Sequence, residues 1–395
     1  MNFVAKLRIT REQFLILIVV FPFFLSYQIT NMFNLGALSA SWRLFDLFIV
    51  VVLYLYRNVL PSKITCMLLV LWMTIFFSSL LNNNDVYASA IKILSIFTFI
   101  LLVDYFYKKN SINCLKCLLF VFEILIYSNL VAIIVFPQGF NEGDHEKIWL
   151  LDNYSAQLKW FLPAVCVAFD YTVKTKLTNR TYFLYAAIFI TTILSGSATL
   201  TSTVAVMIIL WIFVKKNIII VNIKTGIEIS LIFLIGIVVF RLQDNFSFII
   251  ETLLNRNLSF TGRTDIWNSA LYMFCNQPII GYGYWVYPPV PHWSPDLYTS
   301  VNGVAVASHA HCQFLHFLIQ GGIIFFSGFV VLNLWLSTKL NKNNSLISRF
   351  AGFFIFLILL AGCVETMYDS PLVFLPYIIA YYSICKNTSC NYRSI

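Results

Sequence analysis

Apolar runs long enough to cross a lipid bilayer recur along almost the whole chain. A helix that spans a bilayer needs about 20 mostly apolar residues. Apolar residues make up 59% of the chain and charged residues 11%, whereas a soluble domain carries about 25% charged residues. We therefore predict an all-α polytopic membrane protein with about twelve transmembrane helices. The candidate segments are 13–30, 38–56, 64–81, 87–107, 117–136, 155–173, 181–196, 199–214, 226–241, 311–336, 350–367 and 371–385.

The positions of lysine and arginine orient these segments. If the N-terminus is cytoplasmic, the segments predicted to lie inside hold 19 of the 26 basic residues. Cytoplasmic loops are enriched in Lys and Arg, so we expect both termini in the cytoplasm and one integral membrane domain over residues 1–395. The net charge of +9 then follows from topology, and it requires no nucleic-acid partner.

The other seven basic residues fall on the outer side or in the outer halves of the predicted spans. Charge inside a membrane is costly and usually functional, although a lysine can also reach the headgroups by snorkelling. Both interpretations stay open for the two lysines at 92 and 159, whereas the arginines favour function. The seven are Arg43, Lys92, Lys147, Lys159, Arg241, Arg256 and Arg263.

The only long connection covers residues 242–310 and is predicted to lie outside. Long loops are usually functional, and we expect short helices of this loop to contribute to an active site. Residues 246–256 have the pattern of a short amphipathic helix. Residues 265–276 have that of a second helix, which Thr261 or Thr264 would cap.

Aromatic residues crowd the same loop. Trp267, Tyr282 and Tyr284 are candidates to contact a substrate, because flat apolar rings with polar rims suit the C–H faces of sugars. The alternative is that Trp and Tyr simply favour the membrane interface. That preference does not account for the four prolines that follow in VYPPVPHWSP.

Three of the five histidines stand in SHAHCQFLHFLIQGG, residues 308–322. Ser308 is predicted to cap a helix that begins near residue 309, which puts His311 in the first turn. A helix N-terminus exposes N–H groups and partial positive charge, so it attracts anions and disfavours imidazolium. A neutral His311 facing an outer cavity is suited to take a proton from a hydroxyl.

Arg263 complements this histidine, because a guanidinium can donate two parallel hydrogen bonds to a phosphate and so hold a leaving pyrophosphate. His309 and His316 fit polar residues at a membrane interface, and His309 is kept as a candidate substrate contact. A zinc site is disfavoured, because no Asp, Glu or Cys near these histidines in the sequence completes a tetrahedron.

GRTDIW at 262–267, PIIGYG at 278–283 and HAHCQFLHFLIQGG at 309–322 together resemble the signature of the O-antigen ligase and Wzy-type polymerase family. These are polytopic enzymes of bacterial surface-polysaccharide assembly. The resemblance is closest over residues 190–335. Arg263 matches the loop arginine of the family pattern, and His311 matches its histidine.

Two positions depart from the family pattern. Cys312 stands where relatives usually carry Asn, and Ala198 stands where many carry an arginine. The missing arginine removes one expected pyrophosphate contact. Arg241, Lys159 or Arg43 are the candidates to replace it.

The resemblance implies a metal-independent glycosyltransferase of GT-C-like architecture without a cofactor in the plasma membrane of a bacterium. Its donor would be an undecaprenyl-pyrophosphate-linked oligosaccharide, and its partners would be membrane lipid and a chain-length regulator protein. The first interpretation is a surface polysaccharide polymerase that transfers the glycan to a sugar hydroxyl of another lipid-linked repeat unit.

Two alternatives remain open. An O-antigen ligase would share the chemistry but transfer the glycan to lipid A core. A transporter of lipid-linked oligosaccharide, from a different functional class, would suit twelve spans. However, the two halves of the sequence show no visible repetition, and the unusual residues gather in one outer loop.

Overall fold

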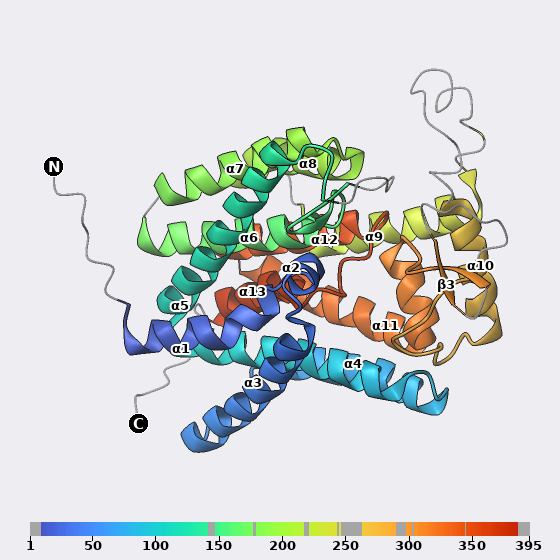
Figure 1. The fold of residues 1–395 in the computed structure, drawn as a ribbon, viewed down its shortest axis with the longest axis horizontal. Coiled ribbons are helices and arrows are strands. Elements are labelled where there is room, and N and C mark those ends of the chain that lie inside the picture. Colours follow the sequence, from blue (N-terminus) through green and yellow to red (C-terminus); the bar gives the residue numbers. More distant parts are fainter. Residues whose placement is uncertain are drawn as a thin grey trace.

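The computed structural model is an assembly of long helices with two short hairpins (Figure 1). The structure describes residues 9–140, 147–176, 179–216, 221–242, 245, 263–289, 298–301, 304–343 and 345–385. In the first half of the chain, the helices are α1 (Arg11–Val20), η1 (Phe21–Phe24), α2 (Tyr27–Met32), α3 (Gly36–Arg57), α4 (Lys63–Leu81) and α5 (Val86–Val135). The helices that follow are α6 (Leu158–Thr175), α7 (Asn179–Ser195), α8 (Ala198–Lys216), α9 (Ile223–Phe233), η2 (Leu234–Val239), α10 (Arg263–Asn276), α11 (Gln313–Lys342), α12 (Leu346–Ala361), η5 (Pro371–Phe374) and α13 (Leu375–Cys385).

Every predicted span is helical, but not every one is a single long helix. Among the described residues, five helices are long and apolar enough to cross a membrane: α3, α4, α5, α8 and α11. The predicted span 13–30 is instead divided into α1, η1 and α2, with Pro22 in the break, because proline removes a backbone donor. Two predicted spans are joined in α5, which is kinked at Asn110. A multi-pass membrane protein is thus supported, while the count of twelve and the orientation stay predictions.

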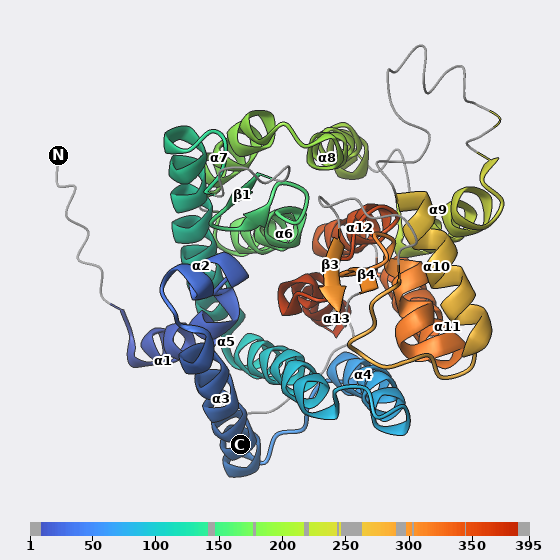
Figure 2. The same cartoon turned by 45° about the vertical axis from the view of Figure 1, so that its right-hand side comes forward.

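The core lies where α6, α9, α11, α12 and α13 pack together, as Figures 1 and 2 show from two directions. The close approach of α9 to α12 depends on a small residue. A Cβ at Gly226 of α9 would lie 3.1–3.2 Å from side chains of Leu359 and Phe356 in α12. α3, in contrast, stands at the edge of the assembly (Figure 1), and its outward face is apolar and exposed. That face suits contact with lipid tails.

The long predicted loop builds one end of the molecule. It supplies α10 and a hairpin of β3 (Tyr298–Val301) and β4 (Val304–Ala307), and both lie beside α11 in Figure 2. A second hairpin pairs β1 (Ile148–Trp149) with β2 (Asp152–Asn153). α10 confirms the helix predicted over 265–276, although Thr264 lies inside it and does not cap it. The predicted helix 246–256 and Thr261 lie outside the described residues.

Residues 278–283 fill a break in α11 at Gly322. There φ is 60° and ψ is −163°, a conformation that is essentially restricted to glycine. The interrupted helix frees backbone groups, and the adjacent segment pairs with them. Tyr282 and Gly283 donate N–H groups to carbonyls of α11, at 2.8 Å each, and Pro278 accepts from Ile323 at 2.8 Å. We call this backbone pairing of residues 278–283 with α11 the clasp.

We expect Gly322→Ala to destabilise the protein by more than 2 kcal/mol, because its φ is strained for an L residue and its Cβ would lie 2.2 Å from the Ile279 carbonyl oxygen. Thermal unfolding in detergent measures the loss. Gly352→Ala in α12 is the matched control, since its Cβ would meet only a Leu340 side chain at 3.5 Å. Equal unfolding temperatures for the two variants would contradict the role given to the clasp.

Candidate functional site

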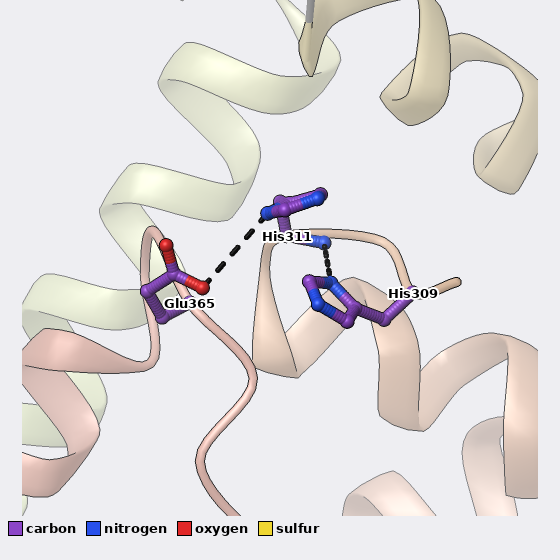
Figure 3. A group of neighbouring side chains, drawn as sticks. All are labelled: His309, His311 and Glu365. Carbon is purple, nitrogen blue, oxygen red and sulfur yellow. Dashed lines mark hydrogen bonds and ion pairs between the residues drawn. The ribbon is translucent and has the colours of Figure 1, made fainter. Parts of the chain in front are cut away.

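Two imidazoles and one carboxylate meet at the N-terminal end of α11 (Figure 3). The Nδ1 atom of His311 lies 3.8 Å from Oε2 of Glu365. The backbone N–H of His311 donates to Nδ1 of His309 at 3.3 Å, and the two rings are 4.0 Å apart. Glu365 comes from the loop that follows α12, more than fifty positions along the chain. The fold therefore assembles a cluster that the local sequence does not contain.

Arg263, the first residue of α10, contacts the same carboxylate. Its guanidinium donates to Oε1 of Glu365 at 3.0 Å and to the carbonyl oxygen of Val364 at 2.6 Å. The side chains of Arg263 and Glu365 are 19% and 5% exposed, so the pair is largely shielded from water. The two residues predicted to be catalytic, Arg263 and His311, are thus brought together through Glu365.

His311 does not lie in a first helical turn, so that prediction was wrong. α11 begins at Gln313, and His311 precedes its N-cap with φ of 45°. The local signal at Ser308 misled because the carbonyl of Gly362 takes the N–H of Gln313 at 2.7 Å and so sets where the helix starts. Left-handed backbone in a non-glycine residue costs about 1–3 kcal/mol and is concentrated at functional sites.

The expectation of a neutral His311 is supported, but the cause differs from the one predicted. Burial lowers the pKa of His311 to about 3, and the positive charges of Arg263 and Lys159 act in the same direction. Burial and the neighbouring His311 also hold the pKa of His309 well below its usual value. Nδ1 of His311 is buried and has no hydrogen-bond partner among the described residues. A further negative charge beside this imidazole would raise its pKa.

Buried contacts fix the turn that carries the histidines. Trp267 of α10 is 2% exposed and donates its indole N–H to the carbonyl of Ala310 at 3.0 Å. Oε1 of Gln313 accepts from the N–H groups of Met367 and Tyr368, at 2.6 and 3.0 Å. The first contact ties the turn to α10, and the second ties it to the loop that carries Glu365.

An aromatic-lined cavity of about 140 Å³ opens beside His309. An apolar cavity of similar size holds a benzene ring, so a six-membered sugar ring is of a suitable size. We call it the ring cavity. It is lined by Trp72, Lys92, Tyr284, Trp285, Val286, Tyr287, Ser308, His309, Gln313, His316, Gln320, Thr366, Tyr368 and Asp369.

The two lysines left open by the sequence differ in their partners. Lys159 in α6 forms an ion pair with Asp369 at 2.8 Å, and its side chain is 11% exposed. Lys92 in α5 lines the ring cavity, and it forms no ion pair within the described part of the chain. Neither ammonium therefore simply snorkels to the surface.

The other predicted contact residues lie in varied places. Tyr284 is buried and lines the ring cavity, as expected of a sugar contact. Trp267 is 2% exposed and does not line the ring cavity, so its packing does not support the predicted contact with a sugar. Tyr282 lies in the clasp, outside the cavity lining, and Arg43 donates twice to the carbonyl of Pro22, at 2.9 and 3.1 Å. Arg241 lies just beyond η2 and makes no ion pair with a described residue.

His309, His311 and Glu365 also have the composition of a metal site, because one ligand atom from each lies within 4.8 Å of the others. The expectation that no carboxylate joins the histidines was therefore wrong. However, Glu365 already neutralises Arg263, so a divalent cation would face an adjacent guanidinium with little compensating charge.

Three residues of the site escaped the sequence analysis as site residues: Glu365, Asp369 and Lys92. Glu365 lies near the end of the apolar run 350–367, and Asp369 lies between it and the run 371–385, so the two runs concealed the loop that carries both acids. The available signal was two acids, in VETMYDS, on the predicted outer side of a chain with only 17 acidic residues. Lys92 was noted as a basic residue in the outer part of a predicted span but was not assigned to the site.

Comparison with known proteins gives one family. Residues 181–330 match the family model described as O-antigen ligase, a segment that contains Arg263, His311 and the clasp but precedes Glu365. No curated protein matches the chain. Members of the matched family are membrane glycosyltransferase-like ligases and polymerases. The match over residues 181–330 therefore makes this part of the chain similar to the O-antigen ligase and Wzy-type family.

Proposed function

We propose that this chain is a surface polysaccharide polymerase of the bacterial plasma membrane. It transfers an undecaprenyl-pyrophosphate-linked glycan to a sugar hydroxyl of another lipid-linked repeat unit on the outer face. The observation that carries the proposal is the buried Arg263–Glu365–His311 cluster, which adjoins an aromatic-lined cavity at the end of the molecule built by the long loop.

The reaction is a single displacement. The oxygen of the acceptor hydroxyl attacks the anomeric carbon of the donor, and the bond from that carbon to the pyrophosphate oxygen breaks. The pyrophosphate leaves with the electron pair, and the hydroxyl proton passes to His311. The arriving anionic donor raises the pKa of His311 and makes it a better base.

Glu365 and Arg263 support this transfer with charges of opposite sign. Glu365, 3.8 Å from Nδ1 of His311, offsets the positive charge that the imidazole gains. Arg263 fixes the carboxylate and adds positive charge on the side where the pyrophosphate develops its own negative charge. Pre-positioned charges of this kind need no rearrangement during the reaction.

Lys159 is the best placed of the three candidates to replace the arginine missing at Ala198. Its charge acts on both His309 and His311, and it is held near them by Asp369. The guanidinium of Arg43 is hydrogen-bonded to the carbonyl oxygen of Pro22, and Arg241 stays a candidate from the sequence alone.

The acceptor distinguishes a polymerase from a ligase. We expect purified enzyme in nanodiscs, given only lipid-linked repeat units, to produce a ladder of longer lipid-linked glycans on a gel. Deletion of the gene should leave single repeat units on the cell surface. A ladder that requires added lipid A core, or a deletion strain without any surface glycan, would show a ligase instead. The His311→Ala enzyme serves as the inactive control.

A further inference from the structure

A second hollow meets the ring cavity at Lys92. It has a volume of about 220 Å³ and lies between α3 and the first half of α5, two helices that are apolar and long enough to span a membrane. We call it the tail groove. Its walls are mostly apolar, and Lys92 and Trp285 line both hollows. The tail groove is lined by Ala40, Arg43, Leu44, Tyr87, Ala88, Ile91, Lys92, Leu94, Ser95, Thr98 and Trp285.

Charge at this junction is unbalanced. Lys159 is paired with Asp369, and Arg263 is paired with Glu365. Lys92 lies near the same Asp369 carboxylate and near Arg43, but among the residues that the structure describes it has no ion pair or hydrogen bond of its own. A half-buried ammonium that shares one carboxylate with Lys159 is only partly compensated, and such a charge is costly, so this position favours an anionic ligand.

Unpaired hydrogen-bonding groups surround the same point. The indole N–H of Trp285 and Nδ1 of His316 are both buried without a partner in the described structure. Trp285 lines both hollows, and His316 lines the ring cavity. Buried polar groups are nearly always hydrogen-bonded to protein, ordered water or ligand, so both groups are available to a ligand bound in these hollows.

We propose that the tail groove, Lys92 and the ring cavity form one binding path for a lipid-linked sugar. The isoprenoid tail lies between α3 and α5, the phosphate contacts Lys92 and Trp285, and the attached sugar occupies the ring cavity, which ends at His309. The order of apolar, cationic and aromatic surfaces matches the order of the three parts of such a lipid. The assignment rests on the proposed function and adds the route by which the acceptor, the second lipid-linked repeat unit, reaches the site from the membrane.

Retention of undecaprenyl phosphate by the detergent-purified full-length protein, measured by native mass spectrometry, tests this path. We expect Lys92→Met to lower retention roughly tenfold, the scale of one charge-assisted contact, and Lys92→Arg to restore most of it. The wild-type protein should retain undecaprenol, which lacks the phosphate, as weakly as the Lys92→Met variant retains undecaprenyl phosphate. Lys63→Met, at the exposed start of α4, is the matched lysine control.

The groove is tested separately. Ala88→Trp fills the tail groove and should lower retention, whereas Leu38→Trp, at an exposed position of α3 outside the groove lining, should not. Unchanged retention in Lys92→Met would overturn the proposal. Displacement of the lipid by inorganic pyrophosphate, together with no effect of Ala88→Trp, would show a free-phosphate site and overturn it as well.

The transfer assay separates this inference from the proposed function. If the lipid binds through Lys92 but no glycan is transferred by the wild-type enzyme, the path stands and the proposed reaction fails. If glycan is transferred while Lys92→Met binds and reacts like the wild type, the reaction stands and the path fails. The unfolding temperatures of all variants identify any that are misfolded. If Lys92→Met is misfolded, the retention measured for Lys92→Arg and Ala88→Trp decides whether the path is correct.

Discussion

His311→Ala is expected to lower glycan transfer by roughly 10²- to 10⁴-fold, the usual contribution of a positioned general base. The protein should still reach the membrane, because the histidine turn is held by Trp267 and Gln313 and not by the imidazole. The measurement is the rate of ladder formation from purified lipid-linked repeat units.

Cys312→Ala is the matched control for this substitution. Cys312 is the adjacent residue and is fully buried, and burial raises the pKa of its thiol to about 12, so it is not an available nucleophile at neutral pH. We expect its activity to stay within a few-fold of the wild type. Normal chain lengths in the His311→Ala strain would remove His311 as the base.

The low pKa of His311 also sets the pH profile. The base works when neutral, so activity is lost only as the pH falls through the pKa of the free enzyme, about 3. We expect kcat/KM to change little between pH 7.5 and pH 5. A histidine with the ordinary pKa of ~6.5 would lose roughly thirtyfold by pH 5, and such a loss would contradict the buried, neutral imidazole.

Arg263→Lys is expected to impair both stability and transfer. One ammonium cannot reproduce the two directed bonds that the guanidinium makes to Glu365 and to the Val364 carbonyl. Arg263→Gln should be more severe, because it leaves Glu365 buried without its counter-charge. Breaking a buried ion pair costs about 3–5 kcal/mol, read from the unfolding temperature, and transfer should fall at least about tenfold.

The double variant Arg263→Gln with Glu365→Gln separates the two effects. It removes both charges, so stability should largely recover, whereas transfer should stay low because the charges themselves are missing. The control pair is Arg180 and Glu123, 2.5 Å apart on the predicted cytoplasmic side. Its disruption should cost stability and leave transfer per folded molecule unchanged. Recovery of full transfer in the Arg263 double variant would reduce the pair to a structural role.

The length of the apolar runs predicted where most helices lie, because contact with lipid dictates which residues a spanning helix carries. Residues 38–56 and 64–81 were assigned nearly to the ends of α3 and α4. The interruption near Pro22 and the merging at Asn110 were missed, since apolar composition alone does not show where a backbone bends. The hairpin of β3 and β4 was missed because four prolines dominate the sequence that precedes it.

The site was predictable in part. Arg263 and His311 stood out as a cation and an imidazole in an otherwise apolar chain, and the structure brings them to one carboxylate. Glu365 could not be paired with them from sequence, because the contact spans more than fifty positions. The helix start was misplaced for a similar reason: the group that accepts the Gln313 N–H belongs to Gly362, in a distant segment.

The clasp joins residues 278–283 to α11 almost wholly through main-chain atoms. The clasp therefore places few constraints on which side chains this segment carries, apart from the glycines that must approach α11 closely. Selection can thus alter the neighbouring rings of the pocket, such as Tyr284 and Trp285, without displacing the histidine turn. With this arrangement, the residues that would select the sugar can change while Arg263, His311 and Glu365 keep their relative positions.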